Sequence, residues 1–394
     1  MKAFKYILII AIILSSLSLF YLRGLGIVVR LMDVFTVILI LISLLSYILY
    51  SRLNNPIKPH FSISIFILLA GVIISSLSAY YFNHQSWGIT LYQQRHMYAF
   101  LFYFLLFFLA PKPEWIVNTL FYMGIVTAFF FLVQYILFPT LITDAKIFLD
   151  RGTIRMNLPG AHYMHIAFFL SVDRFFTTYK KKYAFGVALF FIVSILLGFR
   201  STIALYILIS TIFLLISEQV KQKILLFTLY ATIVVSGFFA FQEIFFEMKE
   251  SAVREGSQGT SYIRYRAAEH FLSLNNSDNL TYIIGNGEPS ERSVYGRDLA
   301  LISMMYGFYL SDIGIFGFYF KYGLISSLAL LYVFFRVIFT KTEKGFTFLK
   351  LFFVFQLFQL PFSRTPFESL YSIVAICMLL YLFDVSLHKK LEPA

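Results

Sequence analysis

Residues 184–217 read AFGVALFFIVSILLGFRSTIALYILISTIFLLIS, a stretch in which Arg200 is the one charged residue. A helix needs about 20 apolar residues to cross the hydrocarbon core of a bilayer, and about 17 to 25 are tolerated. The stretch therefore predicts two short transmembrane helices, over residues 184–199 and 201–217, joined by a tight turn. A charge is far better tolerated at the membrane surface than at the bilayer centre, so we expect Arg200 at one surface.

The rest of the chain repeats this apolar pattern. Of its 394 residues, 59% are hydrophobic and 13% are charged, whereas about 25% of the residues of a soluble domain are charged. Twelve runs are long enough to span a membrane or nearly so: 4–22, 31–50, 61–81, 97–110, 115–138, 163–177, 184–199, 201–217, 224–242, 313–335, 346–362 and 367–387. We therefore expect an all-α polytopic membrane protein with about twelve transmembrane helices, in which residues 1–394 form a single membrane domain.

The lysines predict the orientation of the chain. When the twelve runs alternate through the membrane, fourteen of the seventeen lysines fall on the same side as the N-terminus; Lys146, Lys249 and Lys321 do not. Cytoplasmic loops are enriched in lysine and arginine. We therefore expect both termini in the cytoplasm and the longest polar segment, residues 243–312, outside, between the ninth and tenth spans. The excess of basic residues then reflects membrane orientation, and we expect no nucleic-acid partner.

The arginines have the opposite distribution, because twelve of the fifteen fall on the outer side in the same topology. Insertion treats the two basic residues nearly alike, so the difference needs a reason specific to guanidinium. Its rigid fork of donors binds phosphate and carboxylate bidentately and keeps its charge. The outer arginines are Arg23, Arg30, Arg95, Arg151, Arg155, Arg200, Arg254, Arg264, Arg266, Arg292, Arg297 and Arg364.

The long outer segment has features of an ordered loop. Loops longer than about 12–15 residues are usually functional or disordered. SYIRYRAAEHFL, residues 261–272, predicts an amphipathic helix against the membrane face, with Tyr262, Tyr265, Ala268 and Phe271 at helical spacing. YIIGNGEPSERSVYGRD follows as a turn region rich in charged residues. A solvated surface loop without a function is the alternative.

A second outer segment, TDAKIFLDRGTIRMNLPGAHYMH, precedes the sixth span. His162 and His165 could suggest a metal site, but no Cys or carboxylate pattern accompanies them, and we interpret them as residues of a helix start at the interface. The chain also lacks the Asp-x-Asp pair with which many glycosyltransferases hold a metal. Cys377 is the single cysteine and allows no disulfide or zinc framework within one chain. We expect no cofactor.

Arg200 has two interpretations. Its side chain could simply reach the headgroups from the end of the helix. It could instead face a polar cavity together with Arg155 and the arginines of the long segment, and the distribution of arginines favours this second interpretation. Gly198 would ease the turn before it, and Ser201 or Thr202 would cap the next helix.

In order and spacing, residues 150–340 resemble the O-antigen polymerase and O-antigen ligase superfamily, which joins lipid-linked sugar chains outside the cytoplasmic membrane. The matching pieces are RMNLPGAHYMHIAFFLS, LLGFRSTIALYIL, the long outer segment with RYRAAEHFL and YIIGNGEPS, and the Gly-rich YLSDIGIFGFYFKYGL. Ligases of this group carry a histidine just before the Gly-rich span, whereas DLALISMMYGFYLSDIG has none. The resemblance therefore points to a repeat-unit polymerase (Wzy-type) and leaves the catalytic base unassigned.

The resemblance implies a GT-C-like fold in a bacterial cytoplasmic membrane and a metal-independent glycosyltransferase. Its substrates would be undecaprenyl-pyrophosphate-linked oligosaccharides, and its product O-antigen of lipopolysaccharide or a capsule. Membrane lipids, and a chain-length regulator protein, are the other partners that it allows.

The reaction needs positive charge at the leaving pyrophosphate and a base at the attacking hydroxyl. The candidates for pyrophosphate binding are Arg155, Arg200, Arg264, Arg266, Arg292 and Arg297. The candidate bases are the outer carboxylates Asp298, Glu288, Glu291 and Asp312, with His270 less favoured. Asp312 could equally cap the tenth span.

Other classes remain open. A flippase for lipid-linked oligosaccharides would also have about twelve spans and a basic interior. Its loops are expected to be short on both sides of the membrane, so the long segment 243–312 argues against this class. A solute transporter would usually show paired Gly/Pro-broken helices in two halves, and no convincing pair is found. An O-antigen ligase is disfavoured by the missing histidine.

The topology predicts the outcome of reporter fusions. A fusion at Ser257 should give an external signal and a fusion at Lys181 a cytoplasmic one, because the lysines place these residues on opposite sides of the membrane. A cytoplasmic signal at Ser257 would refute the orientation.

Overall fold

The computed structural model describes residues 2–50, 59–150, 153–218, 220–274, 279–361 and 366–388, so Arg151 and Arg364 lie outside the described residues. The α-helices are α1 (Lys2–Ser16), α2 (Gly26–Tyr50), α3 (Ser62–Tyr81), α4 (Trp87–Gln93), α5 (Phe102–Leu109), α6 (Pro113–Leu137), α7 (Ala161–Thr178), α8 (Lys181–Leu196), α9 (Arg200–Ile216), α10 (Lys223–Ala240), α11 (Gln242–Ser257), α12 (Ile263–Leu274), α13 (Asn279–Ile284), α14 (Val294–Tyr306), α15 (Ile315–Phe339), α16 (Thr347–Gln359) and α17 (Leu370–His388). The 3-10 helices are η1 (Ser18–Tyr21), η2 (Gln94–Leu101), η3 (Gly259–Ser261) and η5 (Leu310–Ile313), and the strands are β1 (Ile147–Asp150) and β2 (Thr153–Met156).

The chain is an α-helical membrane protein. Within the described residues, six helices are long and apolar enough to cross a membrane, and α9 and α16 are shorter apolar helices. Every apolar run of the sequence contains helix, although the run 97–110 is divided between η2 and α5. Among these six long helices, α17 is the most enclosed, because 89% of an 18-residue stretch of it is buried inside the protein. The other helices therefore pack around α17.

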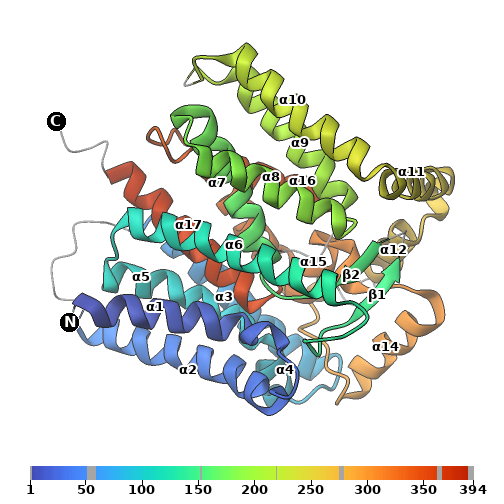
Figure 1. Ribbon diagram of the computed structural model, residues 1–394. Coiled ribbons are helices and arrows are strands. Elements are labelled where there is room, and N and C mark those ends of the chain that lie inside the picture. Colours follow the sequence, from blue (N-terminus) through green and yellow to red (C-terminus); the bar gives the residue numbers. More distant parts are fainter. Residues whose placement is uncertain are drawn as a thin grey trace.

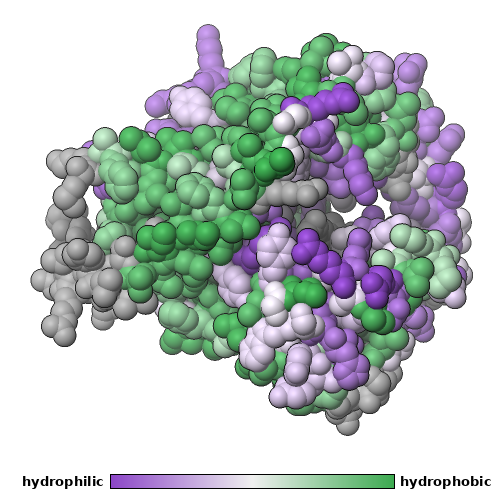
Figure 2. Space-filling view, turned by 90° about the horizontal axis from the view of Figure 1, so that it is seen from below, coloured by the Kyte–Doolittle hydropathy of each residue, from purple (hydrophilic) through white to green (hydrophobic). Residues whose placement is uncertain are grey.

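The molecule has an apolar part and a polar end. The start of α1 and the end of α17 lie at one end, and β1, β2, α11, α12 and α14 lie at the opposite end, which we call the polar end (Figure 1). Figure 2 shows apolar side chains over the part nearest α1 and α2, whereas hydrophilic side chains gather toward the polar end, where the surface is hollowed. The polar segment 243–312 is therefore largely helical and folds over one end of the bundle.

Two details of the polar end differ from the sequence-based expectation. A short antiparallel hairpin, β1 and β2, precedes α7, where we expected no strand. Its Ile, Phe and Thr residues favour strands, but four-residue strands carry a weak signal. In α12 the buried residues are Ala267 and Phe271, while Tyr265 is exposed. The helix packs on Phe308 of the polar segment and on Phe320 of α15. Of the expected apolar face, Ala268 and Phe271 therefore do pack against the protein, whereas Tyr265 does not.

A break in α15 connects the polar segment to the bundle. Gly323 has non-helical angles, φ 74° and ψ −177°, inside the helix. The carbonyls of Phe320 and Lys321 accept hydrogen bonds from the backbone N–H groups of Asn286 and Gly287, at 2.9 and 2.8 Å. Gly285 has φ +79°, and a Cβ atom there would lie 2.4 Å from the Lys321 carbonyl oxygen. The sequence GNG therefore meets the broken helix backbone to backbone, an approach that glycine allows.

Candidate functional site

Two neighbouring cavities open at the polar end. Cavity I, about 970 Å³, lies among β2, the first turn of α7, the α8–α9 turn, α11, α12 and the end of α16. Cavity II, about 530 Å³, lies among the residues around η1 and η2, the connection before β1, the GNGEPS segment and the start of α17. Asn157 lines both, so the two cavities adjoin.

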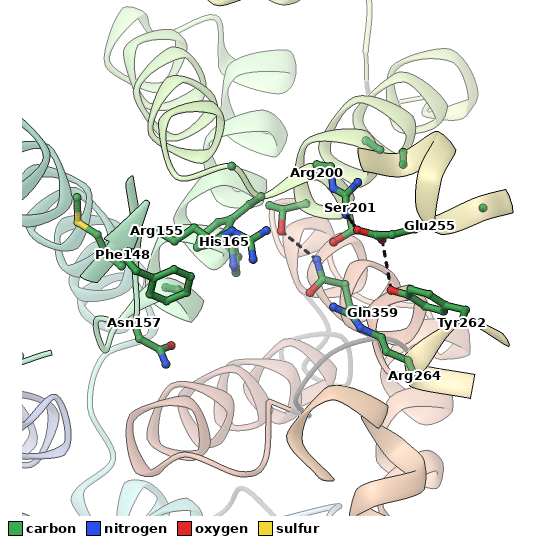
Figure 3. A pocket seen from close by; sticks show the side chains of 18 of the residues that line it. Phe148, Arg155, Asn157, His165, Arg200, Ser201, Glu255, Tyr262, Arg264 and Gln359 are labelled. Atoms are coloured by element: carbon green, nitrogen blue, oxygen red, sulfur yellow. Dashed lines mark hydrogen bonds and ion pairs between the residues drawn. The ribbon is translucent and has the colours of Figure 1, made fainter. Parts of the chain in front are cut away.

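Three of the candidate arginines line cavity I. Arg155 comes from β2, Arg200 is the first residue of α9, and Arg264 comes from α12. Figure 3 shows their side chains around the same space, with His165 and Gln359 between them. Three segments that are far apart in the sequence thus bring three guanidinium groups to one cavity.

The turn before Arg200 packs against the hairpin. Gly198 has φ +68°, as its expected role in the turn requires, and a Cβ atom there would lie 2.7 Å from Thr153 Oγ1 on β2. The prediction that Ser201 or Thr202 caps this helix was wrong. Helix α9 starts at Arg200, and its N-cap residue is Phe199, whose side chain makes no capping hydrogen bond. Thr202 Oγ1 instead accepts a hydrogen bond from Gln359 Nε2 at 3.1 Å and ties α9 to α16.

Glu255 of α11 holds the Arg200 side chain. Arg200 Nη2 lies 2.7 Å from Glu255 Oε1, and Arg200 Nη1 donates to the Met248 carbonyl at 3.2 Å. Tyr262 donates from its hydroxyl to Glu255 Oε2 at 3.4 Å. A guanidinium has five N–H donors, and the two bonds above use two of them. The pair therefore fixes the orientation of Arg200 and leaves donors for a ligand.

The two histidines of α7 belong to the wall of cavity I. His165 Nδ1 lies 2.6 Å from the Tyr206 hydroxyl, and His162 Nδ1 lies 2.8 Å from Ser372 Oγ. Both side chains thus connect α7 to neighbouring helices. In the part of the chain that the structure describes, no group of three or more His, Cys, Asp and Glu side chains is placed to hold a metal ion.

The other three candidate arginines lie elsewhere on the polar end. The guanidinium of Arg266 lies 5.7 Å from the centre of the Phe308 ring, and that of Arg292 lies 5.9 Å from the centre of the Tyr92 ring. Arg297 is exposed on α14. None of the three lines cavity I or cavity II.

The four candidate carboxylates are also separated. Glu288 lines cavity II, and Glu291 lines a smaller cavity beside Arg292. Asp298 and Asp312 are exposed. Asp312 is not the cap of α15, because that position is Gly314, and no side-chain cap is formed there. His270, the less favoured candidate, lies with its ring centre 5.6 Å from that of Phe308.

A buried lysine connects two carboxylates beneath cavity II. Lys321, in the broken part of α15, is 5% exposed; its Nζ lies 3.2 Å from Glu288 Oε2 and also contacts Glu368 Oε1. The Tyr322 hydroxyl donates to Glu288 Oε2 at 2.7 Å. Burial raises the pKa of Glu288. The charges of Lys321 and His96 and the hydrogen bond from Tyr322 together lower it by more than burial raises it, so this pKa lies below its usual value. Glu288 is therefore ionised at neutral pH.

Sequence reasoning missed three of these charged residues. Glu255 belongs to a polar helix without a motif, and Glu368 begins an apparently ordinary apolar run. Lys321 was assigned to the outer side but given no role. An ionisable residue inside an apolar run is a signal of a functional site, and FYFKYGL carries that signal.

Replacing Lys321 should destabilise the protein most at neutral pH. Lys321→Met leaves two carboxylates without their cation, and breaking a buried pair costs about 3–5 kcal/mol. Since the pKa of Glu288 is lowered, the pairing stabilises the protein above about pH 4.3, the ordinary Glu value, and this stability is lost as the pH falls through the lowered pKa. The thermal unfolding midpoint should therefore drop strongly at pH 7 and less at acidic pH. Lys249→Met, at an exposed site on α11, is the control; equal midpoints for both variants would contradict the prediction.

Comparisons with known proteins add no relative. No family model matches the chain, and no curated protein matches its sequence. The chemistry of the site therefore rests on its own geometry: a cavity that collects three guanidinium groups, beside a second cavity that collects carboxylates.

Proposed function

We propose that the protein is a glycosyltransferase that polymerises undecaprenyl-pyrophosphate-linked oligosaccharide repeat units on the outer face of a bacterial cytoplasmic membrane. One observation carries the proposal: Arg155, Arg200 and Arg264, from three distant segments, line one cavity at the polar end of an apolar helical bundle. A lipid-linked pyrophosphate carries its anionic group at the end of a hydrocarbon chain, so a basic cavity at the polar end of an apolar bundle would suit it. The resemblance to the O-antigen polymerase superfamily supports the same reaction.

In this proposal the chain crosses the membrane about twelve times in a GT-C-like arrangement, with both termini cytoplasmic. The six long apolar helices and the shorter helices α9 and α16 support a multi-pass protein. The start of α1 and the end of α17 lie at the end of the molecule opposite the cavities, in keeping with this topology (Figure 1).

The arginines would act on the leaving group. When the bond between the sugar and the pyrophosphate breaks, negative charge grows on the phosphate oxygens, and preorganised donors in a site of low dielectric constant stabilise it. Arg200 is suited to this role because Glu255 holds its guanidinium at 2.7 Å before any substrate binds. Arg155 and Arg264 would reach the same group from other walls of cavity I.

Glu288 is the carboxylate that this geometry favours as the base. It lines the cavity that adjoins cavity I, whereas Glu291, Asp298 and Asp312 line neither cavity. Its lowered pKa keeps it ionised at neutral pH, as a general base must be, and at the same time makes it a weaker base than an unpaired carboxylate.

Deleting the protein from its own cell should test the function directly. A polymerase mutant should display surface glycan with single repeat units in place of a ladder, because units are still delivered but not joined. Electrophoresis of the surface glycan measures this. Loss of all surface units, with lipid-linked precursor accumulating inside, would instead indicate a flippase.

Substitutions of Arg200 test the assignment of cavity I. Arg200→Ala should slow polymerisation by about 10- to 100-fold, since a charged hydrogen bond contributes about 1.5–3 kcal/mol and about 1.36 kcal/mol is tenfold in rate. Arg200→Lys should recover only part, because lysine keeps the charge without the bidentate fork. The assay is extension of purified lipid-linked repeat units, with and without chelator.

Arg254→Ala, at an exposed site on the same helix as Glu255, is the matched control and should retain the wild-type rate. The amount of each variant in the membrane is measured as well. Wild-type rates for both Arg200 variants would remove cavity I from the reaction.

A further inference from the structure

Cavity II differs from cavity I in charge. Cavity I contains three arginines and one carboxylate, that of Glu255. Cavity II contains four carboxylates, and its basic side chains are Arg95, His96 and Lys146. The carboxylates are those of Asp33, Asp144, Glu288 and Glu368. Carboxylates and basic side chains nearly balance in cavity II, so it attracts a pyrophosphate less than cavity I does and is better suited to a neutral ligand.

The strongest cations near cavity II are already paired. Arg95 Nη2 lies 3.0 Å from Asp33 Oδ2, and Lys321 contacts both Glu288 and Glu368. Two carboxylates thus share one ammonium in a partly buried cluster, and their four oxygens outnumber its three N–H donors. The exposed fraction of the Glu288 side chain is 21%, so this carboxylate opens to the cavity, while that of Glu368 is 2%. A ligand that donates neutral hydrogen bonds would complete the cluster.

The rest of the wall of cavity II offers both hydrogen-bond donors and hydrogen-bond acceptors. Gln93 and Ser369 supply donors and acceptors, and the hydroxyl-bearing rings of Tyr21 and Tyr371 lie in the same wall. Sugar hydroxyls donate to carboxylates and accept from amides and guanidinium groups, and sugar faces pack on aromatic rings. A volume of about 530 Å³ is within the usual range of about 300–1,000 Å³ for small-molecule sites. A neutral, hydroxyl-rich ligand fits this lining.

We propose that cavity II binds the acceptor sugar, the residue of the second lipid-linked unit that presents the attacking hydroxyl. The assignment rests on the proposed function, and it adds a separate site for the acceptor. The shared residue Asn157 marks where the two cavities meet, so a sugar in cavity II can present its hydroxyl toward a donor held in cavity I.

The step balances without another reactant. The acceptor hydroxyl gives its proton to the Glu288 carboxylate and forms a bond from its oxygen to the anomeric carbon of the donor. The bond from that carbon to the pyrophosphate oxygen breaks, and the electron pair leaves with the pyrophosphate beside Arg155, Arg200 and Arg264. Glu288 then releases its proton to water.

The test measures binding of a sugar that carries no lipid and no phosphate. The probe is the oligosaccharide of the cell's own repeat unit, released from its carrier by mild acid and titrated by NMR into the full-length protein in nanodiscs. Glu288→Gln should raise the dissociation constant about tenfold or more, because a charged acceptor is lost. Asp144→Asn, at an exposed position of the rim, should raise it about threefold. Arg200→Ala should leave it unchanged.

Asp144→Asn keeps the test valid if Glu288→Gln fails to fold, since Asp144 is exposed. Glu269→Gln, exposed on α12, is the matched control and should bind as the wild type does. Wild-type affinity in the cavity II variants, or loss of binding in Arg200→Ala alone, would overturn the sugar site. Sugar binding at cavity II in a protein that fails to extend lipid-linked units would instead refute the proposed function and the acceptor role with it.

Discussion

The backbone hydrogen bonds between the GNG segment and the broken helix α15 hold the polar end to the bundle. Buried backbone donors and acceptors must be paired, and a break in an apolar helix leaves carbonyls that need new partners. Asn286 and Gly287 supply them by donating to Phe320 and Lys321. The same contact places Glu288, one residue further, above the side chain of Lys321. Cavity II therefore depends on the break, because the break positions both the wall and the charge beneath it.

The two cavities use different cations for a physical reason. Lys321 is compact, and its three donors can serve two carboxylates that approach from different elements, as Glu288 and Glu368 do. Arg200 lies in an open cavity, where a planar fork can bind two partners from α11, Glu255 and the Met248 carbonyl, and still present further donors. Lys321 thus suits the structural pairing of two buried carboxylates, whereas the arginines of cavity I suit the binding of a ligand.

Sequence reasoning predicted the helices well, because long apolar runs are an unambiguous signal: helix occurs in every run, and Gly198 forms the turn before Arg200. It did not predict which outer residues converge. Arg264 and Arg266 are two positions apart on α12, so they lie on different sides of the helix. The packing of Ala267 and Phe271 against the protein, which local spacing does not predict, orients the helix so that Arg264 lines cavity I. The hairpin, Glu255 and the Lys321 cluster depend on tertiary contacts between distant segments, which leave no pattern in local spacing.

In the proposed function, the arrangement of charge also separates two requirements of glycosyl transfer. In cavity I the one carboxylate, that of Glu255, is paired with Arg200 and orients its guanidinium. Glu288 lines the adjoining cavity, apart from the three arginines of cavity I, and Lys321 keeps it ionised. The two cavities share one wall residue, Asn157, so a leaving group beside the arginines of cavity I and a base at Glu288 would lie in adjoining spaces with separate ion pairs.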